Sequence, residues 1–283
     1  MLLGCIMTSL ADIADIQGKI DEVIARRLDR LLLLEEERRG ASKDALVFVG
    51  IANVASSHWC RMKSVLQSRS EEWMFFDAYL RDRLLYAYLL GMIRKLPRLS
   101  KDLLSVGSEI SQEHIEDLLK RVRKRKSRKP ADTIRAQARL QKLDWQRRGD
   151  KAEKMFSESY PTLRWNFTLG RYVAVGVPDG ITDSFVYEFK STKRPDYIEK
   201  VYQRAALQAD LYRYFFGRSQ KRIQILSIPN EKLESWDEEA DPQNAKKVLE
   251  CFSRIDGGWL PPLPEKYKCR TCEFKAECPI LKH

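Results

Sequence analysis

The sequence contains no apolar run of the roughly 18 residues that a membrane-spanning helix requires. Its first residues, MLLGCIMTSLADIADIQGK, lack the basic start and the sustained apolar stretch of a secretory signal. Internal repeats are also absent from the sequence. These absences predict a cytoplasmic protein that has no membrane as its partner.

The composition narrows the class of protein further. Six cysteines in a cytoplasmic chain argue against disulfides, because reducing conditions favour metal-bound or catalytic thiols. A length of 283 residues with 43% hydrophobic and 10% aromatic content fits a globular protein of one large or two modest domains. The formal charge of +11 favours a polyanionic partner such as nucleic acid, because Lys and Arg that neutralise phosphates release counterions.

The apolar pattern changes its period along the chain. Helical spacing predicts helices over residues 11–39, 70–96, 133–159, 196–217 and 242–255. Aromatic and β-branched residues between glycines and prolines predict short antiparallel strands over 163–192, and 222–229 is a further strand. A Pro-rich connection, 257–269, leads into the last cysteines.

A dense basic run precedes the strand-rich block. Eight of the ten residues from 120 to 129 are basic: Lys120, Arg121, Arg123, Lys124, Arg125, Lys126, Arg128 and Lys129. Like charges at this density repel one another unless an anion lies among them. The run is therefore either a solvated arm or a nucleic-acid contact.

Three charged residues in the strand-rich block could carry chemistry. Asp179 lies in the turn VPDG, and the strand YEFKS places Glu188 and Lys190 on one face, about 7 Å apart. One interpretation is an ion pair on a half-exposed strand. The other is a phosphodiester hydrolase in which carboxylates hold Mg²⁺ or Mn²⁺ and Lys190 orients the attacking water.

The following helix and the C-terminus offer two more sets. Gln208 and Tyr212 are four residues apart on one helical face, where they could bind a nucleic-acid backbone. Near the end, Cys269, Cys272 and Cys278 supply three thiolates, one fewer than a four-ligand metal site needs.

The order of these motifs resembles a known group of nucleases. Asp, then Glu-x-Lys, Gln-x3-Tyr and Cys-x2-Cys-x5-Cys is similar to the iron–sulfur branch of the RecB-like PD-(D/E)xK nucleases, above all a CRISPR-associated exonuclease family. The resemblance runs from Asp179 to Cys278 and loosely includes Cys60. It implies an α/β fold with a mixed central sheet flanked by helices, a helical N-terminal region and a C-terminal iron–sulfur segment.

The same resemblance suggests the missing cysteine. The family's fourth ligand lies before the nuclease core, which points to Cys60, and the four thiolates would hold a 4Fe–4S cluster. Cys251 is the rival, although it lies in a helical pattern where a buried structural thiol is the commoner outcome. Four thiolates bind Zn²⁺ equally well, so a zinc-containing nucleic-acid-binding protein without catalytic activity is an alternative.

The sequence also departs from the family. Members place a His in a G-x-x-x-H motif before the strands, whereas this chain has Gly149 followed by Glu153, a carboxylate that can take the same role as metal ligand. The resemblance divides the chain into an N-terminal helix with the first cluster cysteine (1–60), a basic helical insert (61–145), a nuclease core (146–262) and a cysteine segment that packs back on the N-terminal region (263–283).

The resemblance implies a function as well. It predicts an Mg²⁺- or Mn²⁺-dependent exonuclease that digests single-stranded DNA from 5′ to 3′ and trims DNA during CRISPR spacer acquisition. The CRISPR integrase and further copies of the chain are the implied protein partners. A stand-alone RecB-like repair or viral nuclease is an alternative that the sequence does not separate from this one.

Overall fold

The structure is a computed structural model that describes residues 10–25, 46–89, 145–157, 160 and 162–282. These residues form two compact units, each built from separate segments of the chain. The described parts of the first unit are 10–25, 46–48, 73–89 and 164–175. The second unit contains the remaining described residues and includes every predicted site residue that the structure describes.

The first unit combines helices with strands of a three-stranded sheet in the order β1-β3-β2. Its elements are α1 (Leu10–Ala25), β1 (Val47–Gly50), α5 (Glu72–Leu89), β2 (Trp165–Leu169) and β3 (Tyr172–Gly176). The ring of Phe48 on β1 lies 5.0 Å from the rings of Phe76 and Tyr79 on α5. Buried Asp82 accepts hydrogen bonds from Arg164, with a shortest distance of 2.6 Å.

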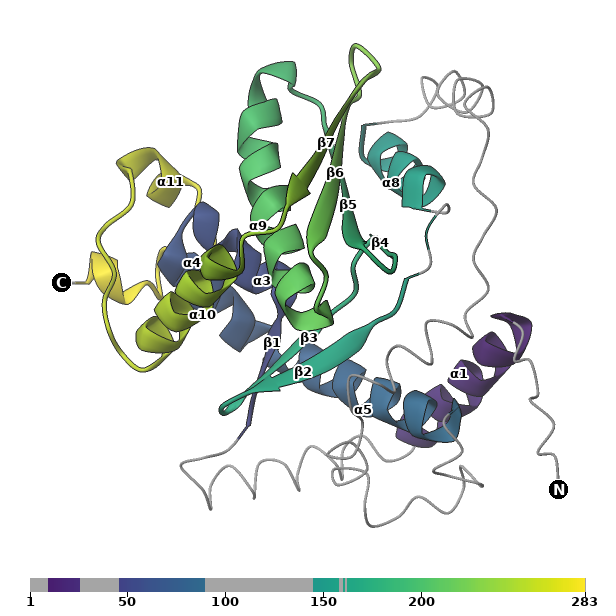
Figure 1. Ribbon diagram of the computed structural model, residues 1–283. Helices are drawn as coiled ribbons and strands as arrows, with labels where there is room; N and C mark the ends of the chain where they lie inside the picture. The colour runs from purple at the N-terminus through teal and green to yellow at the C-terminus, as the bar shows by residue number, and fades with distance from the viewer. Residues whose placement is uncertain (1–9, 26–45, 90–144, 158–159, 161, 283) are drawn as a thin grey trace, which may run out of the picture. The chain divides into compact units, whose positions relative to one another are not determined.

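A mixed four-stranded sheet forms the centre of the second unit (Figure 1). The strands follow the order β4-β5-β6-β7: β4 (Gly180–Ile181), β5 (Phe185–Thr192), β6 (Gln220–Ser227) and β7 (Lys232–Glu239). Strands β5 and β6 are parallel, and the other two pairs are antiparallel. This mixed sheet is the arrangement that the resemblance predicted.

Helices cover both faces of this sheet. On one face α8 (Trp145–Ser157) packs against Tyr187 and Phe189. On the other face α9 (Ile198–Phe216) packs against Ile223 and Ile225, the β6 partners of Glu188 and Lys190. The side chains of β5 therefore alternate between an apolar face under α8 and a polar face under α9.

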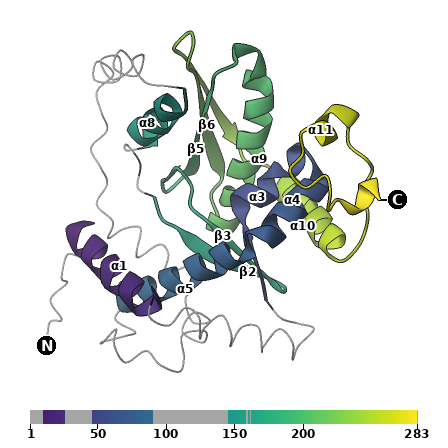
Figure 2. The same ribbon diagram turned by 180° about the vertical axis from the view of Figure 1, so that it is seen from behind.

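Shorter elements lie beyond α9, away from the sheet, in both views of the structure (Figures 1 and 2). They are α3 (Ile51–Ala55), η1 (Ser56–His58), α4 (Arg61–Ser70), α10 (Pro242–Asp256), α11 (Lys266–Arg270) and η4 (Pro279–Leu281). Helix α9 itself follows the 3₁₀ turn η3 (Pro195–Tyr197), and it ends because Gly217 adopts the left-handed conformation with φ of 65°.

The predicted elements are present where the structure describes the chain, but β1, α3, α4, α11 and β7 were not predicted. Strand β7 was not predicted, because charged residues dominate its sequence KLESWDEE and conceal the strand period. Among the described strands it pairs only with β6, and charged side chains are common on such edge strands because they discourage pairing with other chains. Among the described residues, no helix combines the length and the hydropathy needed to cross a membrane.

Candidate functional site

The carboxylate of the charged pair on β5 is fully buried, whereas the side chain of Lys190 is 24% exposed. Glu188 has no solvent exposure, and its Oε1 accepts a hydrogen bond from Lys190 Nζ. Lys190 Nζ also donates to the Phe189 carbonyl oxygen at 3.0 Å and lies 3.8 Å from Asp179 Oδ2. The ion pair of the first interpretation is therefore present, but its carboxylate is removed from water, unlike that of an ordinary surface ion pair.

Asp179 is fixed by the strand that carries the pair. Its Oδ2 accepts a hydrogen bond of 2.7 Å from the backbone N–H of Phe189, between Glu188 and Lys190. Asp179 lies directly before β4, which pairs with β5, so the turn and the strand are held in one register. The sheet thus brings both carboxylates to the same ammonium group.

Burial dominates the electrostatics of this group. It raises the pKa of Glu188 to about 8, with Asp179 adding to the rise and Lys190 opposing it. Burial also raises the pKa of Asp179, against the effects of Lys190 and the Phe189 N–H. The pKa of Lys190 is raised as well: burial lowers it, but Glu188 and Asp179 together outweigh that effect.

One oxygen of the pair has no hydrogen-bond partner among the described residues. Glu188 Oε2 is buried, and no described side chain or backbone group forms a hydrogen bond to it. A buried carboxylate oxygen without a partner costs free energy unless a cation or donor from outside the protein compensates it. This oxygen is a candidate metal ligand.

Helix α8 brings a third carboxylate close to this group. Glu153 is exposed to solvent, but partial desolvation and the negative charge of Asp179 raise its pKa, and Lys190 opposes the rise. The helix can approach β5 closely at Gly149, where an added Cβ would lie 2.7 Å from Ser191 Oγ. The Gly149 and Glu153 pair singled out in the sequence therefore lies beside the acidic residues.

Helix α9 brings Gln208 and Tyr212 to the same site. Both side chains are buried, and the Tyr212 hydroxyl is hydrogen-bonded to the Gln208 side chain and the Val177 backbone. Burial raises the pKa of Tyr212, and the negative charges of Glu188 and Asp179 raise it further. The tyrosine hydroxyl therefore lies within the electrostatic reach of the carboxylates.

Sequence reasoning missed a residue that shapes this site. An added Cβ at Gly176 would lie 2.6 Å from Tyr212 Cε1 and 2.8 Å from Ile51 Cδ1, so only glycine leaves room for the ring. The signal in the sequence is a glycine three residues before Asp179, which by its pattern alone indicates only a break between strands.

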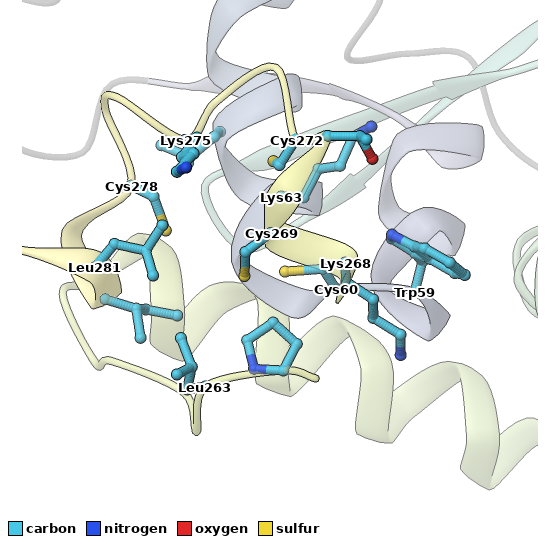
Figure 3. A pocket seen from close by; sticks show the side chains of 14 residues that line it. Trp59, Cys60, Lys63, Leu263, Lys268, Cys269, Cys272, Lys275, Cys278 and Leu281 are labelled. Atoms are coloured by element: carbon cyan, nitrogen blue, oxygen red, sulfur yellow. The ribbon is translucent and has the colours of Figure 1, made fainter. Parts of the chain in front are cut away.

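The four predicted cluster cysteines line one pocket of about 90 Å³ (Figure 3). Cys60 precedes α4, Cys269 lies in α11, Cys272 follows α11, and Cys278 precedes η4. Burial raises the pKa of the Cys269 thiol, and the other three cysteines raise it further. Cys251 lies in α10 and is not among the residues that line this pocket.

A salt bridge of 2.9 Å between Lys63 and Glu273 links α4 to the cysteine segment. Within the part of the chain that the structure describes, no three His, Cys, Asp or Glu side chains are already arranged to hold a metal ion. The predicted basic run from Lys120 to Lys129 lies outside the described residues.

Comparisons with known proteins bear on the carboxylate site. A family model described as the PD-(D/E)XK nuclease superfamily matches residues 94–279, which include the acidic residues and the C-terminal cysteines. A search of curated proteins finds no match.

Among solved structures, the chain is similar to the crystal structure of SSO0001, with 14% sequence identity, a TM-score of 0.39, and coverage of 90% of this chain and 96% of that chain.

Proposed function

This chain belongs to the PD-(D/E)XK nuclease superfamily, and from that premise we propose that it is a metal-dependent DNA nuclease whose active site contains Asp179, Glu188 and Lys190. The observation that carries the proposal is the fully buried Glu188, whose Oε1 binds Lys190 while Oε2 has no partner among the described residues. A protein that only binds DNA gains nothing from this costly arrangement.

The donor set fits the metals that the superfamily typically uses, because carboxylate oxygens are the preferred ligands of Mg²⁺ and suit Mn²⁺. Glu153, Asp179 and Glu188 would hold the ion. When bound, the ion would polarise the phosphodiester and lower the pKa of a water molecule. Without the ion, the ionised members of this carboxylate group would repel a phosphate.

The protein's own residues would supply the remaining functions. Lys190 stays protonated because Glu188 and Asp179 raise its pKa, so its ammonium group can stabilise negative charge that develops on the phosphate. Tyr212 and Gln208 lie on the α9 side and would position the nucleic-acid backbone against the carboxylates.

We further propose that the substrate is single-stranded DNA digested from 5′ to 3′, and that the enzyme trims DNA during CRISPR spacer acquisition together with the integrase. The support is the resemblance of the ordered motifs from Asp179 to Cys278 to the CRISPR-associated exonuclease family. A stand-alone repair or viral nuclease with the same site is the alternative, and copurification with the integrase distinguishes the two.

The four cysteines around one pocket support a second, structural cofactor. Cys60, Cys269, Cys272 and Cys278 would hold a 4Fe–4S cluster that joins α4 to the C-terminal segment, with no redox step required for hydrolysis. Zinc is the alternative for the same thiolates. Anaerobically purified protein will be brown with broad visible absorbance if the cluster is present and colourless if zinc is bound.

The substitution Lys190→Ala tests the catalytic proposal. Cleavage of a labelled single strand should fall below detection, while the affinity for the strand and the content of bound iron stay at the wild-type level. Lys246→Ala on α10, an exposed lysine, is the matched control and should cut normally. Cleavage by Lys190→Ala at the wild-type rate would overturn the proposed active site.

A further inference from the structure

An oblique row of side chains on α9 leads from the candidate active site to the protein surface. Lys200, Arg204, Gln208 and Tyr212 follow one another at intervals of four residues, so their side chains form a stripe along the helix. Lys200 and Arg204 are exposed, whereas Gln208 and Tyr212 are buried at the carboxylates. The stripe thus changes from exposed and basic to buried and polar over about 18 Å of helix.

Aromatic rings flank the exposed end of this stripe. The Tyr197 ring, directly before α9, has the Arg194 guanidinium 3.8 Å and the Lys200 ammonium 4.6 Å from its centre. A second group lies at the cysteine segment, where the Trp59 and Tyr267 rings meet edge to face at 5.8 Å. Tyr267 is 49% exposed.

The second group lies beside the first half of α9. Its Trp59 follows η1, which packs on α9, and the Lys268 ammonium is 5.0 Å from the Trp59 ring. The pKa of His58 in η1 is lowered mainly by burial, and Arg204 and Lys268 both lower it further. Figures 1 and 2 agree in placing α11 on the side of α9 that faces away from the sheet.

Among the residues that the structure describes, salt bridges involve two of these cations and not the other two, although Lys200 lies near enough to Asp196 and Glu265 to lower the pKa of both. Arg194 pairs with Asp196 at 2.7 Å, and Lys268 pairs with Glu265 at 2.7 Å. Within the described residues, neither Lys200 nor Arg204 takes part in a salt bridge. Exposed cations between aromatic rings match a single nucleic-acid strand, whose phosphates need positive charge and whose unpaired bases stack on rings.

We propose that this aromatic–basic surface, formed by Trp59, Tyr197, Lys200, Arg204 and Tyr267, binds the single strand that enters the active site. Phosphates lie at Lys200 and Arg204, and bases stack on Tyr197 and on the Trp59–Tyr267 pair. Gln208 and Tyr212 continue the path to the carboxylates. The inference rests on the proposed nuclease function and names the surface that delivers its substrate.

Fluorescence anisotropy with a labelled oligothymidylate strand tests the surface without added divalent metal, so that binding is separated from cleavage. Tyr197→Ala and Tyr267→Ala should each weaken binding about tenfold, whereas Tyr197→Phe keeps the ring and should bind like wild type. In Lys200→Gln/Arg204→Gln, the slope of log affinity against log salt should decrease by about 1.4, or about 0.7 for each phosphate that the protein no longer neutralises.

The double substitution Lys246→Ala/Lys247→Ala on α10 removes the same number of exposed charges elsewhere and should leave the slope nearly unchanged. Wild-type affinity and slope in all surface variants would overturn the proposal, as would an equal decrease in the control. These outcomes are independent of the nuclease proposal: if Lys190→Ala still cuts DNA, the catalytic assignment fails while the binding results retain their meaning.

Discussion

The carboxylate site and the cysteine pocket are both assembled from distant segments, yet the protein supports them differently. Glu188 lies on β5, where it is fully buried, and Asp179 lies in the turn directly before β4, where a backbone N–H of β5 fixes it. The four cysteines are only partly buried, and they lie in loops and in α11, a helix of five residues. So short a helix is not stable by itself.

The difference shows what each cofactor would contribute. The carboxylate site keeps its geometry through the sheet, so a metal ion there adds chemistry to a framework that already exists. The cysteine pocket is held by the salt bridge between Lys63 and Glu273 and by contacts among its lining residues. A cluster bound there would therefore contribute folding free energy. Substitutions at the first site should abolish activity at little cost in stability, and substitutions at the second should do the reverse.

The largest expected effect comes from Glu188→Gln. The amide keeps the size of the side chain but removes the charge that would hold a metal ion and pair with Lys190, so cleavage should fall by about 10³-fold or more. The melting temperature should not fall by more than a few degrees, because a costly buried carboxylate is lost. Rate measurements and thermal melts of the same preparation test both statements. A large fall in the melting temperature of Glu188→Gln, or a loss of its bound iron, would contradict the comparison.

Cys269→Ser should have the opposite signature. Loss of one thiolate should release the cluster, remove the visible absorbance and lower the free energy of unfolding by about 3–5 kcal/mol, as expected for a cross-link that closes a loop of about two hundred residues. Cys251→Ser, outside the pocket lining, is the control and should retain iron. Equal loss of iron in the two variants would contradict the assignment of the four pocket cysteines as ligands.

Gly176→Ala tests how finely the carboxylate site is positioned. The new methyl group would force the Tyr212 ring away from its place near Glu188, and cleavage should decrease by about ten- to a hundredfold with unchanged iron content. Gly18→Ala in α1 adds the same methyl group where nothing lies within 4 Å and should cut DNA normally. A fully active Gly176→Ala enzyme would show that the position of Tyr212 is unimportant.

The smallest effect is the dependence of stability on pH. In the metal-free folded protein Glu188 keeps its proton up to a pKa of about 8, whereas a carboxyl group of the unfolded chain loses it near 4.5. The folded state therefore binds more protons between these values, so the free energy of unfolding should fall as the pH rises from about 4.5 to about 8.

Thermal melts of metal-free protein across this range should show a fall of several degrees that Glu188→Gln lacks. Added Mg²⁺ should restore stability mainly at the alkaline end, because it binds the ionised carboxylate. Identical pH profiles for wild type and variant would contradict the raised pKa.

Much of the carboxylate site can be predicted from the periodicity of strands and helices in the sequence. Alternation along a strand places Glu188 and Lys190 on one face, and helical spacing places Gln208 beside Tyr212. Burial of Glu188 could not be inferred, because it depends on α9 covering that face of β5. The same limit applies to Gly176, whose close contact with Tyr212 is a property of tertiary packing.

The cysteine pocket shows the limit more sharply. Local spacing identified three cysteines, but whether Cys60 or Cys251 joins them depends on how α4 and α10 pack against the C-terminal segment. The structure brings Cys60 to the pocket and not Cys251.

A time course of digestion tests the central claim most directly. Single strands labelled at the 5′ or the 3′ end are incubated with wild-type protein or Glu188→Gln, in Mg²⁺, in Mn²⁺ or without metal. The account predicts cleavage by wild type only with metal, with early release of the 5′ label and progressive shortening of the 3′-labelled strand, and none by the variant. Equal cleavage without metal, or by Glu188→Gln, would contradict it.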